Sequence, residues 1–158
     1  MAEKRVPHAP NIARVLNPII HYLVGVGFPT GPIPMILLTV YGRKTGLPHT
    51  TPVGLFEVGG RRYLFSTFGE VNWVRNLRAR GEAIISLHRR KETLVADELS
   101  PEAAAPVLKA VLAPYLASFL LRPMLSSWYG VKRDATLNDY LTVARNHPVF
   151  ELHDRRAA

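Results

Sequence analysis

The sequence predicts an α+β domain whose antiparallel sheet curls into a small barrel with helices around it. Five or six segments are short, apolar and rich in β-formers, and four of them are joined in pairs as hairpins. Helical segments stand at both ends of the chain and between the two hairpins. At 158 residues the chain has the length of one domain, so we treat residues 1–158 as a single unit.

The predicted strands cover residues 35–42, 49–58, 61–67, 82–88, 92–99 and 148–153. The first strand is apolar on both faces, which is typical of a central strand. Gly59-Gly60 indicates a tight turn between the second and third strands. We expect Arg89-Arg90-Lys91 to form the turn of the other hairpin.

The predicted helices cover residues 11–24, 72–81, 100–121 and 136–147. The N-terminal helix is apolar, with Asn11 as its candidate N-cap and an expected kink at Pro18. In the short helix between the hairpins, Asn72 is the candidate N-cap and Gly81 is the expected stop.

The two C-terminal helices begin with recognisable capping signals. Ser100 precedes a proline and a glutamate, which is the pattern of an N-cap. Thr136 and Asp139 have the spacing of a capping box, with Asp where Glu is usual. Pro106 and Pro114 are expected to break or bend the helix that Ser100 begins.

The composition excludes several kinds of functional site. The chain has no cysteine, so disulfides, thiolate metal sites and cysteine nucleophiles are excluded. The six histidines lack metal-ligand spacing, so we expect no metal site. No nucleophile elbow, P-loop or dinucleotide fingerprint occurs. Catalysis by this chain would therefore depend on a bound cofactor.

The charge balance favours anionic partners. Twenty Lys and Arg stand against twelve Asp and Glu, a net charge of +8. The basic residues are scattered in twos and threes, so nucleic-acid binding is not expected. No secretory signal is evident, which favours a cytoplasmic location. Residues 15–42 carry no Asp, Glu, Lys or Arg, but their prolines and glycines argue against a membrane span and leave peripheral membrane contact open.

The stretch YGRKTGLPHTTPVG places two adjacent cations in a turn between apolar segments. Arg43 can bind a phosphate or a carboxylate through two parallel hydrogen bonds, and Lys44 adds a mobile charge. Thr45, Thr50 and Thr51 extend a hydroxyl surface from the turn into the next strand. The pattern predicts an anion-binding turn, and a charged turn that faces only solvent is the alternative.

A second polar segment, STFGEVNWVRNLRARG, leads from a strand into a helix N-terminus, which attracts anions. Ser66, Thr67 and Gly69 could hold a flat ring or a phosphate with hydroxyl and backbone N–H groups. Trp73 is expected to face the core. Arg75 is either solvated or part of the same site.

Large apolar side chains concentrate in the C-terminal half, at Tyr115, Phe119, Leu120, Leu121, Met124, Leu125, Trp128, Tyr129 and Tyr140. They could line a pocket for an oily substrate. Core packing is the commoner role of such residues, and both interpretations stay open at this point.

Three stretches resemble the deazaflavin-dependent nitroreductase family: LLTVYGRKTGLPHTTPVG, FSTFGEVNWVRNLRARGEA and PVFEL near the C-terminus. The likeness covers about residues 35–152. It implies the FMN-binding-like split β-barrel of the flavin/deazaflavin oxidoreductases, an antiparallel six-stranded barrel with flanking helices. It also implies coenzyme F-420 as cofactor, a hydroxylated deazaflavin with a phosphate and an oligoglutamate tail.

The resemblance implies cofactor contacts at Arg43, Lys44, Thr45, His49, Thr50, Thr51, Pro52, Ser66, Thr67, Phe68, Gly69, Trp73, Arg75 and Asn76. The two adjacent cations would meet the phosphate and the acidic tail, and the segment from Ser66 to Gly69 would lie beside the deazaflavin ring. His49 stands where the family commonly has a second arginine, so a weaker hold on the tail is expected. Tyr129 and Tyr140 are the candidate substrate contacts.

The activity implied by the resemblance is hydride transfer from reduced coenzyme F-420 to a lipophilic, electron-poor small molecule such as a quinone, an enone or a nitroaromatic. An FMN-dependent reductase of the same fold is one alternative, because an Arg-Lys turn suits either phosphate. A non-catalytic split barrel that carries a lipid or haem is another. The family includes monomers and homodimers, so both states stay open.

Overall fold

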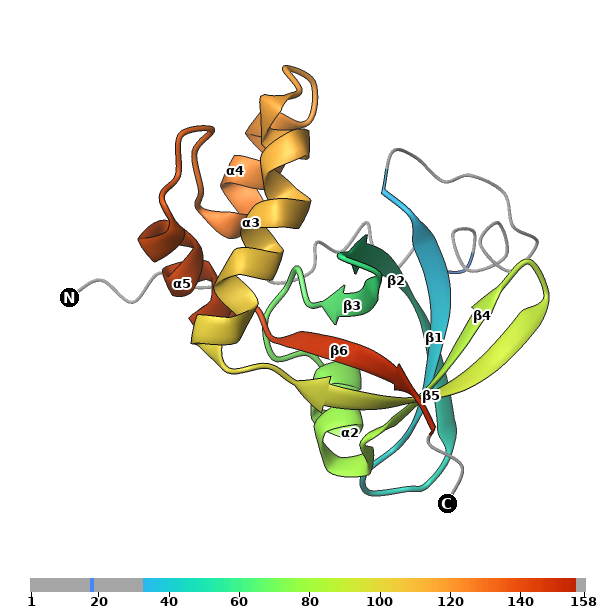
Figure 1. The fold of residues 1–158 in the computed structure, drawn as a ribbon. Helices are drawn as coiled ribbons and strands as arrows, with labels where there is room; N and C mark the ends of the chain where they lie inside the picture. Colours follow the sequence, from blue (N-terminus) through green and yellow to red (C-terminus); the bar gives the residue numbers. More distant parts are fainter. Residues whose placement is uncertain (1–17, 19–32, 156–158) are drawn as a thin grey trace.

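The computed structural model describes residues 33–155 together with Pro18, and it confirms the α+β class. The elements are β1 (Met35–Tyr41), β2 (Pro48–Val58), β3 (Arg61–Phe65), α2 (Asn72–Arg80), β4 (Glu82–Leu87), β5 (Arg90–Glu98), α3 (Pro101–Ala117), α4 (Arg122–Tyr129), α5 (Leu137–Asn146) and β6 (Val149–Asp154). Figure 1 shows α2 at one end of the barrel, and α3, α4 and α5 grouped on the opposite side. The apolar helix predicted at residues 11–24 lies outside the described residues, apart from Pro18.

The six strands form a closed barrel in the order β1-β2-β3-β6-β5-β4, with β4 paired back to β1. Every pair is antiparallel. The C-terminal strand β6 lies between β3 and β5, so it closes a barrel that the earlier hairpins begin. Closure leaves none of these six strands with an unpaired edge.

Two clusters of buried apolar side chains hold the layers together. One fills the barrel and includes Leu38 and Phe150. Val74 and Leu77 of α2 belong to it and are fully buried, so α2 closes one end of the barrel. The other cluster lies between the barrel and the three C-terminal helices, and Tyr140 of α5 is buried in it.

The turns of the two hairpins differ in how well the sequence predicts them. Gly59-Gly60 forms the predicted β2–β3 turn, with φ of 58° and 75°. The β4–β5 turn lies at His88-Arg89, with φ of 48° and 64°, and the prediction of Arg89-Arg90-Lys91 was wrong. Leu87 pairs with Arg90 across the hairpin, and this register leaves room for two turn residues only.

Two internal prolines do not break α3, so the expected break does not occur, and the expected bend stays a prediction. Pro106 and Pro114 each remove a hydrogen bond to the carbonyl four residues earlier, at Glu102 and Ala110. All four residues are exposed, so water can satisfy those carbonyls.

No helix in the described part of the chain is long and apolar enough to cross a membrane.

The capping signals of α3 and α5 are confirmed. Ser100 Oγ accepts a hydrogen bond from the Ala103 N–H group at 3.3 Å. Thr136 Oγ1 accepts one from the Asp139 N–H group, and the Asp139 carboxylate accepts one from the Thr136 N–H group at 2.7 Å. This backbone hydrogen bond lowers the pKa of Asp139, because it favours the charged carboxylate.

The boundaries of α2 and α4 depart from the prediction. The N-cap of α2 is Val71, which makes no side-chain cap, and Asn72 opens the first helical turn instead. The helix predicted over 100–121 ends at Ala117, and α4 follows as a separate helix after a turn. The run across this boundary is mostly apolar, and its clearest stop signal, Pro123, lies in the first turn of α4 rather than at the end of α3.

Ion pairs and a glycine cap fix α2 in place. Arg78 Nε and Nη2 donate to the carboxylate of Glu98 on β5 at 2.6 and 2.8 Å. Arg78 Nη1 donates to Glu70 in the preceding loop at 2.9 Å. The helix ends at Gly81, as predicted, with φ of 70° and its N–H group donated to the carbonyl of Leu77.

We expect Gly81→Ala to lower the free energy of unfolding by about 1–2 kcal/mol, because an L-residue is disfavoured at this left-handed position. No atom lies within 4 Å of an added Cβ, so the cost comes from the backbone rather than from a clash. Urea denaturation measures it. Gly81→Asn is the matched control and should cost less, since Asn tolerates the left-handed region. Equal stability of the wild type and the Ala variant would contradict this cap.

Candidate functional site

A cavity of about 450 Å³ opens where the β1–β2 turn meets the N-terminal half of α2. Its lining comes from two segments far apart in the sequence: Val40, Gly42, Arg43, Lys44, Thr45, His49, Thr51, Val71, Asn72, Trp73 and Asn76. Figure 1 shows this turn and α2 together at the end of the barrel away from α3 and α4. The basic turn and the helix predicted to attract anions therefore form one site, called the basic pocket below.

The side chain of Asn76 holds the arginine of the turn. Its carboxamide oxygen accepts the backbone N–H group of Arg43 at 3.2 Å and the guanidinium Nη1 at 2.8 Å. Asn76 is 5% exposed, so the oxygen is largely shielded from water. Because one oxygen fixes both the backbone and the side chain of Arg43, the guanidinium has a defined position before any ligand binds.

A second residue of α2 braces the same turn. Arg80 Nη2 donates to the carbonyl oxygen of Gly42 at 2.7 Å. Asn76 and Arg80 are four residues apart and therefore share one face of the helix. The sequence analysis did not include Arg80 or Gly42 in the site. The available signal was the four-residue spacing of Asn76 and Arg80 on a short helix whose Val74 and Leu77 pack into the barrel.

Glycine at position 42 allows the turn to close around the pocket. A Cβ there would lie 2.7 Å from Thr45 Oγ1 and 3.1 Å from His49 Nε2, so a larger residue would push both side chains away. Thr45 Oγ1 accepts the N–H group of Leu47 at 3.3 Å, which places its hydroxyl inside the turn. Gly46 has φ of 69°, the left-handed conformation that glycine supplies without strain.

The basic pocket carries uncompensated positive charge. No carboxylate is among its lining residues. Arg43, Lys44 and Arg80 take part in none of the ion pairs found among residues 33–155. Asn72 and Trp73 present the N-terminal turn of α2, whose helix dipole adds to the positive potential. The geometry and the charge both suit a phosphate or a carboxylate.

A second cavity, of about 650 Å³, lies at the β4–β5 hairpin and beside β2 and β3. Its lining includes Arg62 and Glu92, which form an ion pair through two hydrogen bonds of 2.7 and 3.1 Å. This pairing raises the pKa of Arg62, and it lowers the pKa of Glu92. Arg62 of this cavity is thus paired with a carboxylate of the same lining, whereas the lining of the basic pocket contains no carboxylate.

Half of the predicted cofactor contacts line the basic pocket and half do not. Those outside its lining are Thr50, Pro52, Ser66, Thr67, Phe68, Gly69 and Arg75. Thr50 Oγ1 is hydrogen-bonded to Thr39 Oγ1 at 2.7 Å, and Arg75 is exposed on α2. The loop from Ser66 to Gly69 leads to the pocket residue Val71 but makes its own contacts toward the C-terminal helices.

A buried polar network fixes that loop. His147 Nδ1 donates to the carbonyl oxygen of Ser66 at 2.9 Å, because a carbonyl can only accept. The hydroxyl oxygens of Tyr129 and Thr67 are hydrogen-bonded at 2.7 Å, and the ring centroids of Tyr129 and His147 are 4.9 Å apart. Phe68 packs edge to face on Trp128 at 5.8 Å. The sequence analysis missed His147, whose place directly before the last strand gave no sign of this role.

Burial decides the protonation of this network. Desolvation lowers the pKa of His147, so the imidazole is neutral at pH 7. Desolvation also raises the pKa of Tyr129, which keeps its hydroxyl protonated. Of the two predicted substrate contacts, Tyr129 is 7% exposed and reaches the loop, whereas Tyr140 is 1% exposed in the C-terminal core. Neither lines the basic pocket.

Trp73 combines two roles that the sequence analysis treated as alternatives. The centroid of its ring lies 6.0 Å from that of Phe150 in the barrel core, and Trp73 also lines the basic pocket. The barrel core therefore fixes an aromatic wall of the site.

The model of the F420H2-dependent quinone reductase family matches residues 16–119, which include the β1–β2 turn and all of α2. No match was found among curated proteins.

Several solved structures share the fold at low sequence identity. A domain-swapped dimer is 16% identical, with 90% of this chain and 96% of that one covered and a TM-score of 0.52. A pyridoxamine 5'-phosphate oxidase-like protein from Listeria innocua is 10% identical, with 77% and 84% covered and a TM-score of 0.50. An F420-H2 dependent reductase is 18% identical, with 76% and 94% covered and a TM-score of 0.48. The closed barrel and the two likenesses with TM-scores of 0.52 and 0.50 confirm the predicted split-barrel fold.

We expect Arg80→Ala to weaken binding of oxidised coenzyme F-420 by about tenfold, because the β1–β2 turn loses a charge-assisted hydrogen bond. Quenching of deazaflavin fluorescence measures the dissociation constant. Arg145→Ala removes the same charge from an exposed position on α5 and should leave binding unchanged. Equal affinities for the two variants would show that Arg80 does not support the site.

The depressed pKa of His147 gives the fold a dependence on pH. Below the ordinary histidine pKa of 6.5 the unfolded chain binds a proton that the folded chain excludes, so stability should fall as pH drops through that value. We expect His147→Asn, which keeps a donor for Ser66 but does not titrate, to flatten this acid slope in unfolding experiments. His88→Asn, at an exposed turn, should keep the slope. An unchanged slope in His147→Asn would contradict the assignment.

Proposed function

Since the chain belongs to the F420H2-dependent quinone reductase family, we propose that the basic pocket holds the phosphate and the acidic tail of coenzyme F-420. The chain is an oxidoreductase that depends on this cofactor. The acceptor in this proposal is a lipophilic, electron-poor molecule: a quinone, an enone or a nitroaromatic. The observation that carries it is the pair Arg43 and Lys44, which line a cavity without a carboxylate beside a helix N-terminus.

The donors of the basic pocket fit an anionic cofactor. Only one guanidinium nitrogen of Arg43 is used by Asn76, so further N–H groups remain for a phosphate. Lys44 is exposed and can follow a flexible acidic tail. His49 supplies a third polar contact, and Thr45 and Thr51 add hydroxyl groups. The volume of about 450 Å³ is within the range of small-molecule sites.

When bound in its reduced form, coenzyme F-420 supplies a hydride to the acceptor. The chain contributes position and exclusion of water. Val40, Val71 and Trp73 give one side of the pocket an apolar wall, which suits an aromatic ring better than a charged tail. In this proposal the tail and phosphate lie by the β1–β2 turn, and the ring lies by Trp73 and the loop from Ser66 to Gly69. Positioning of the two reactants then supplies most of the rate gain.

The loop from Ser66 to Gly69 connects this wall to Tyr129. In the described structure the hydroxyl of Tyr129 is hydrogen-bonded to that of Thr67, and Tyr129 is not among the residues that line the pocket. We propose that it positions the loop against the ring, and that Tyr140 contributes packing. No strongly acidic group lines the pocket, so water is the simplest source of the proton that completes the reduction.

A monomer and a homodimer are the two oligomeric states that remain to be distinguished for this chain. One of the similar structures is a domain-swapped dimer, which makes a homodimer worth testing by sedimentation.

We expect Lys44→Ala to raise the dissociation constant of coenzyme F-420 by about tenfold and to reduce its salt dependence, because one charge-assisted contact to the anion is lost. Lys109→Ala, an exposed lysine on α3, is the matched control and should bind as the wild type does. FMN and haem are titrated in parallel. Tighter binding of FMN or haem than of coenzyme F-420 would contradict the proposed site. Equal affinities of the two lysine variants for coenzyme F-420 would contradict it as well.

Turnover tests the acceptor class. Reduced coenzyme F-420 is mixed with the protein and menadione, and oxidation of the cofactor is followed by its returning fluorescence. We expect enzyme-dependent oxidation with menadione, and none with a polar, electron-rich phenol of similar size. Tight cofactor binding without oxidation by any quinone, enone or nitroaromatic would show that the chain binds the cofactor but does not catalyse the proposed reaction.

A further inference from the structure

The turn between α3 and α4 displays two large apolar side chains. Phe119 is 87% exposed and Leu120 is 83% exposed, the highest values among the large hydrophobic residues that the structure describes. Figure 1 shows this turn at the opposite end of the molecule from α2 and the β1–β2 turn. An adjacent pair of this kind at the tip of a helical layer is typical of a contact surface.

Hydrogen bonds fix the turn in this shape. The Ser118 N–H group donates to the carbonyl of Tyr115 at 3.1 Å, and the Arg122 N–H group donates to the carbonyl of Ser118 at 3.0 Å. The guanidinium of Arg122 reaches back to the carbonyls of Leu116 and Ala117 at 2.9 and 3.4 Å. The two apolar side chains between these contacts therefore project from a braced tip, not from a frayed helix end.

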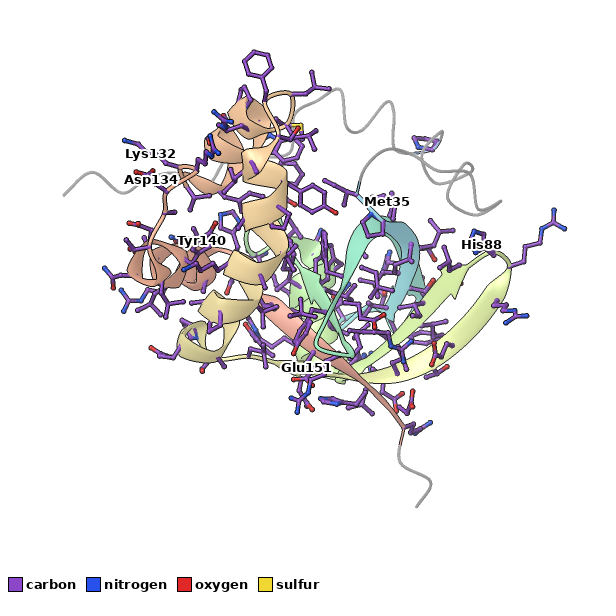
Figure 2. All side chains as sticks on the ribbon, turned by 45° about the horizontal axis from the view of Figure 1, so that its top comes forward. Met35, His88, Lys132, Asp134, Tyr140 and Glu151 are labelled. Atoms are coloured by element: carbon purple, nitrogen blue, oxygen red, sulfur yellow. The ribbon has the colours of Figure 1, made fainter. Side chains whose placement is uncertain are left out.

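Positive charge lies on the same side of the helical layer. Residues 117–135 contain three basic residues and one acidic residue, Asp134, a net charge of +2. Figure 1 shows the α4–α5 loop directed toward the same end as the α3–α4 turn, and Figure 2 shows Lys132 and Asp134 at the outer edge of this layer. Within the described residues, neither Lys132 nor Arg133 forms an ion pair, and the longer-range attraction of Lys132 contributes to the lowered pKa of Asp139 on α5.

We propose that the α3–α4 turn and the α4–α5 loop dock on an anionic lipid surface. Phe119 and Leu120 enter the boundary between headgroups and acyl chains, and Lys132 and Arg133 meet the anionic headgroups. The choice of a lipid surface over a protein groove follows from the charge, since apolar tips with basic neighbours match anionic bilayers. Docking there leaves the basic pocket, at the other end, open to the water-soluble cofactor.

Vesicle flotation tests the proposal on the full-length chain, with vesicles of phosphatidylcholine alone and of phosphatidylcholine mixed with phosphatidylglycerol. We expect the wild type to float with the mixed vesicles. Phe119→Ser with Leu120→Ser should reduce this partitioning by at least about tenfold, because apolar burial is lost. Lys132→Ser with Arg133→Ser should remove the preference for anionic lipid. Leu87→Ser, an exposed leucine on β4, is the matched control and should float as the wild type does.

A second readout separates lipid from protein contact. All variants are compared by sedimentation and by titration with coenzyme F-420, and retained cofactor affinity shows that each is folded. Loss of vesicle binding with retained cofactor affinity supports the proposal. A wild type that fails to float, or a tip variant that floats unchanged, overturns it while leaving the proposed cofactor site intact. A wild-type dimer that Phe119→Ser with Leu120→Ser dissociates would also overturn it, in favour of a second copy of this chain.

Discussion

The carboxamide oxygen of Asn76 accepts both the backbone N–H group and the guanidinium of Arg43, and the geometry of the basic pocket follows from this contact. An arginine at an exposed turn would otherwise sample many rotamers, and a ligand would have to order it on binding. Here the ordering is done by the fold. Arg80 holds the backbone of the same turn four residues further along α2, so the two elements form one rigid unit.

The barrel is what makes this brace possible. Val74 and Leu77 anchor α2 inside the barrel core, and Arg78 ties it to β5 and to the preceding loop. With those faces occupied, the face with Asn76 and Arg80 meets the β1–β2 turn. Closure of the barrel by β6 therefore supports a site to which β6 itself contributes no lining residue. The proposed lipid contact lies on the other layer, so cofactor binding and docking would use separate ends of the molecule.

The barrel was predictable from sequence because it depends on local patterns, and half of the residues proposed to contact the cofactor line one pocket. Alternating apolar strands, the Gly59-Gly60 turn and the Arg43-Lys44 pair are each visible within a few residues. The contacts of Arg80 and His147 were not predictable from sequence, because their partners, Gly42 and Ser66, are distant in sequence. The β4–β5 turn was misplaced because pairing register, not residue type, set its position. The break expected at the prolines of α3 does not occur, and the exposure of the freed carbonyls, which allows this, cannot be read from sequence.

The position of the bound phosphate is the most direct test of the proposed site. A crystal structure with oxidised coenzyme F-420 should place the phosphate within hydrogen-bonding distance of the guanidinium of Arg43 or the ammonium of Lys44, with the ring beside Trp73. A phosphate found instead in the larger cavity beside Arg62, or anywhere on the side of α3 and α4, would contradict it.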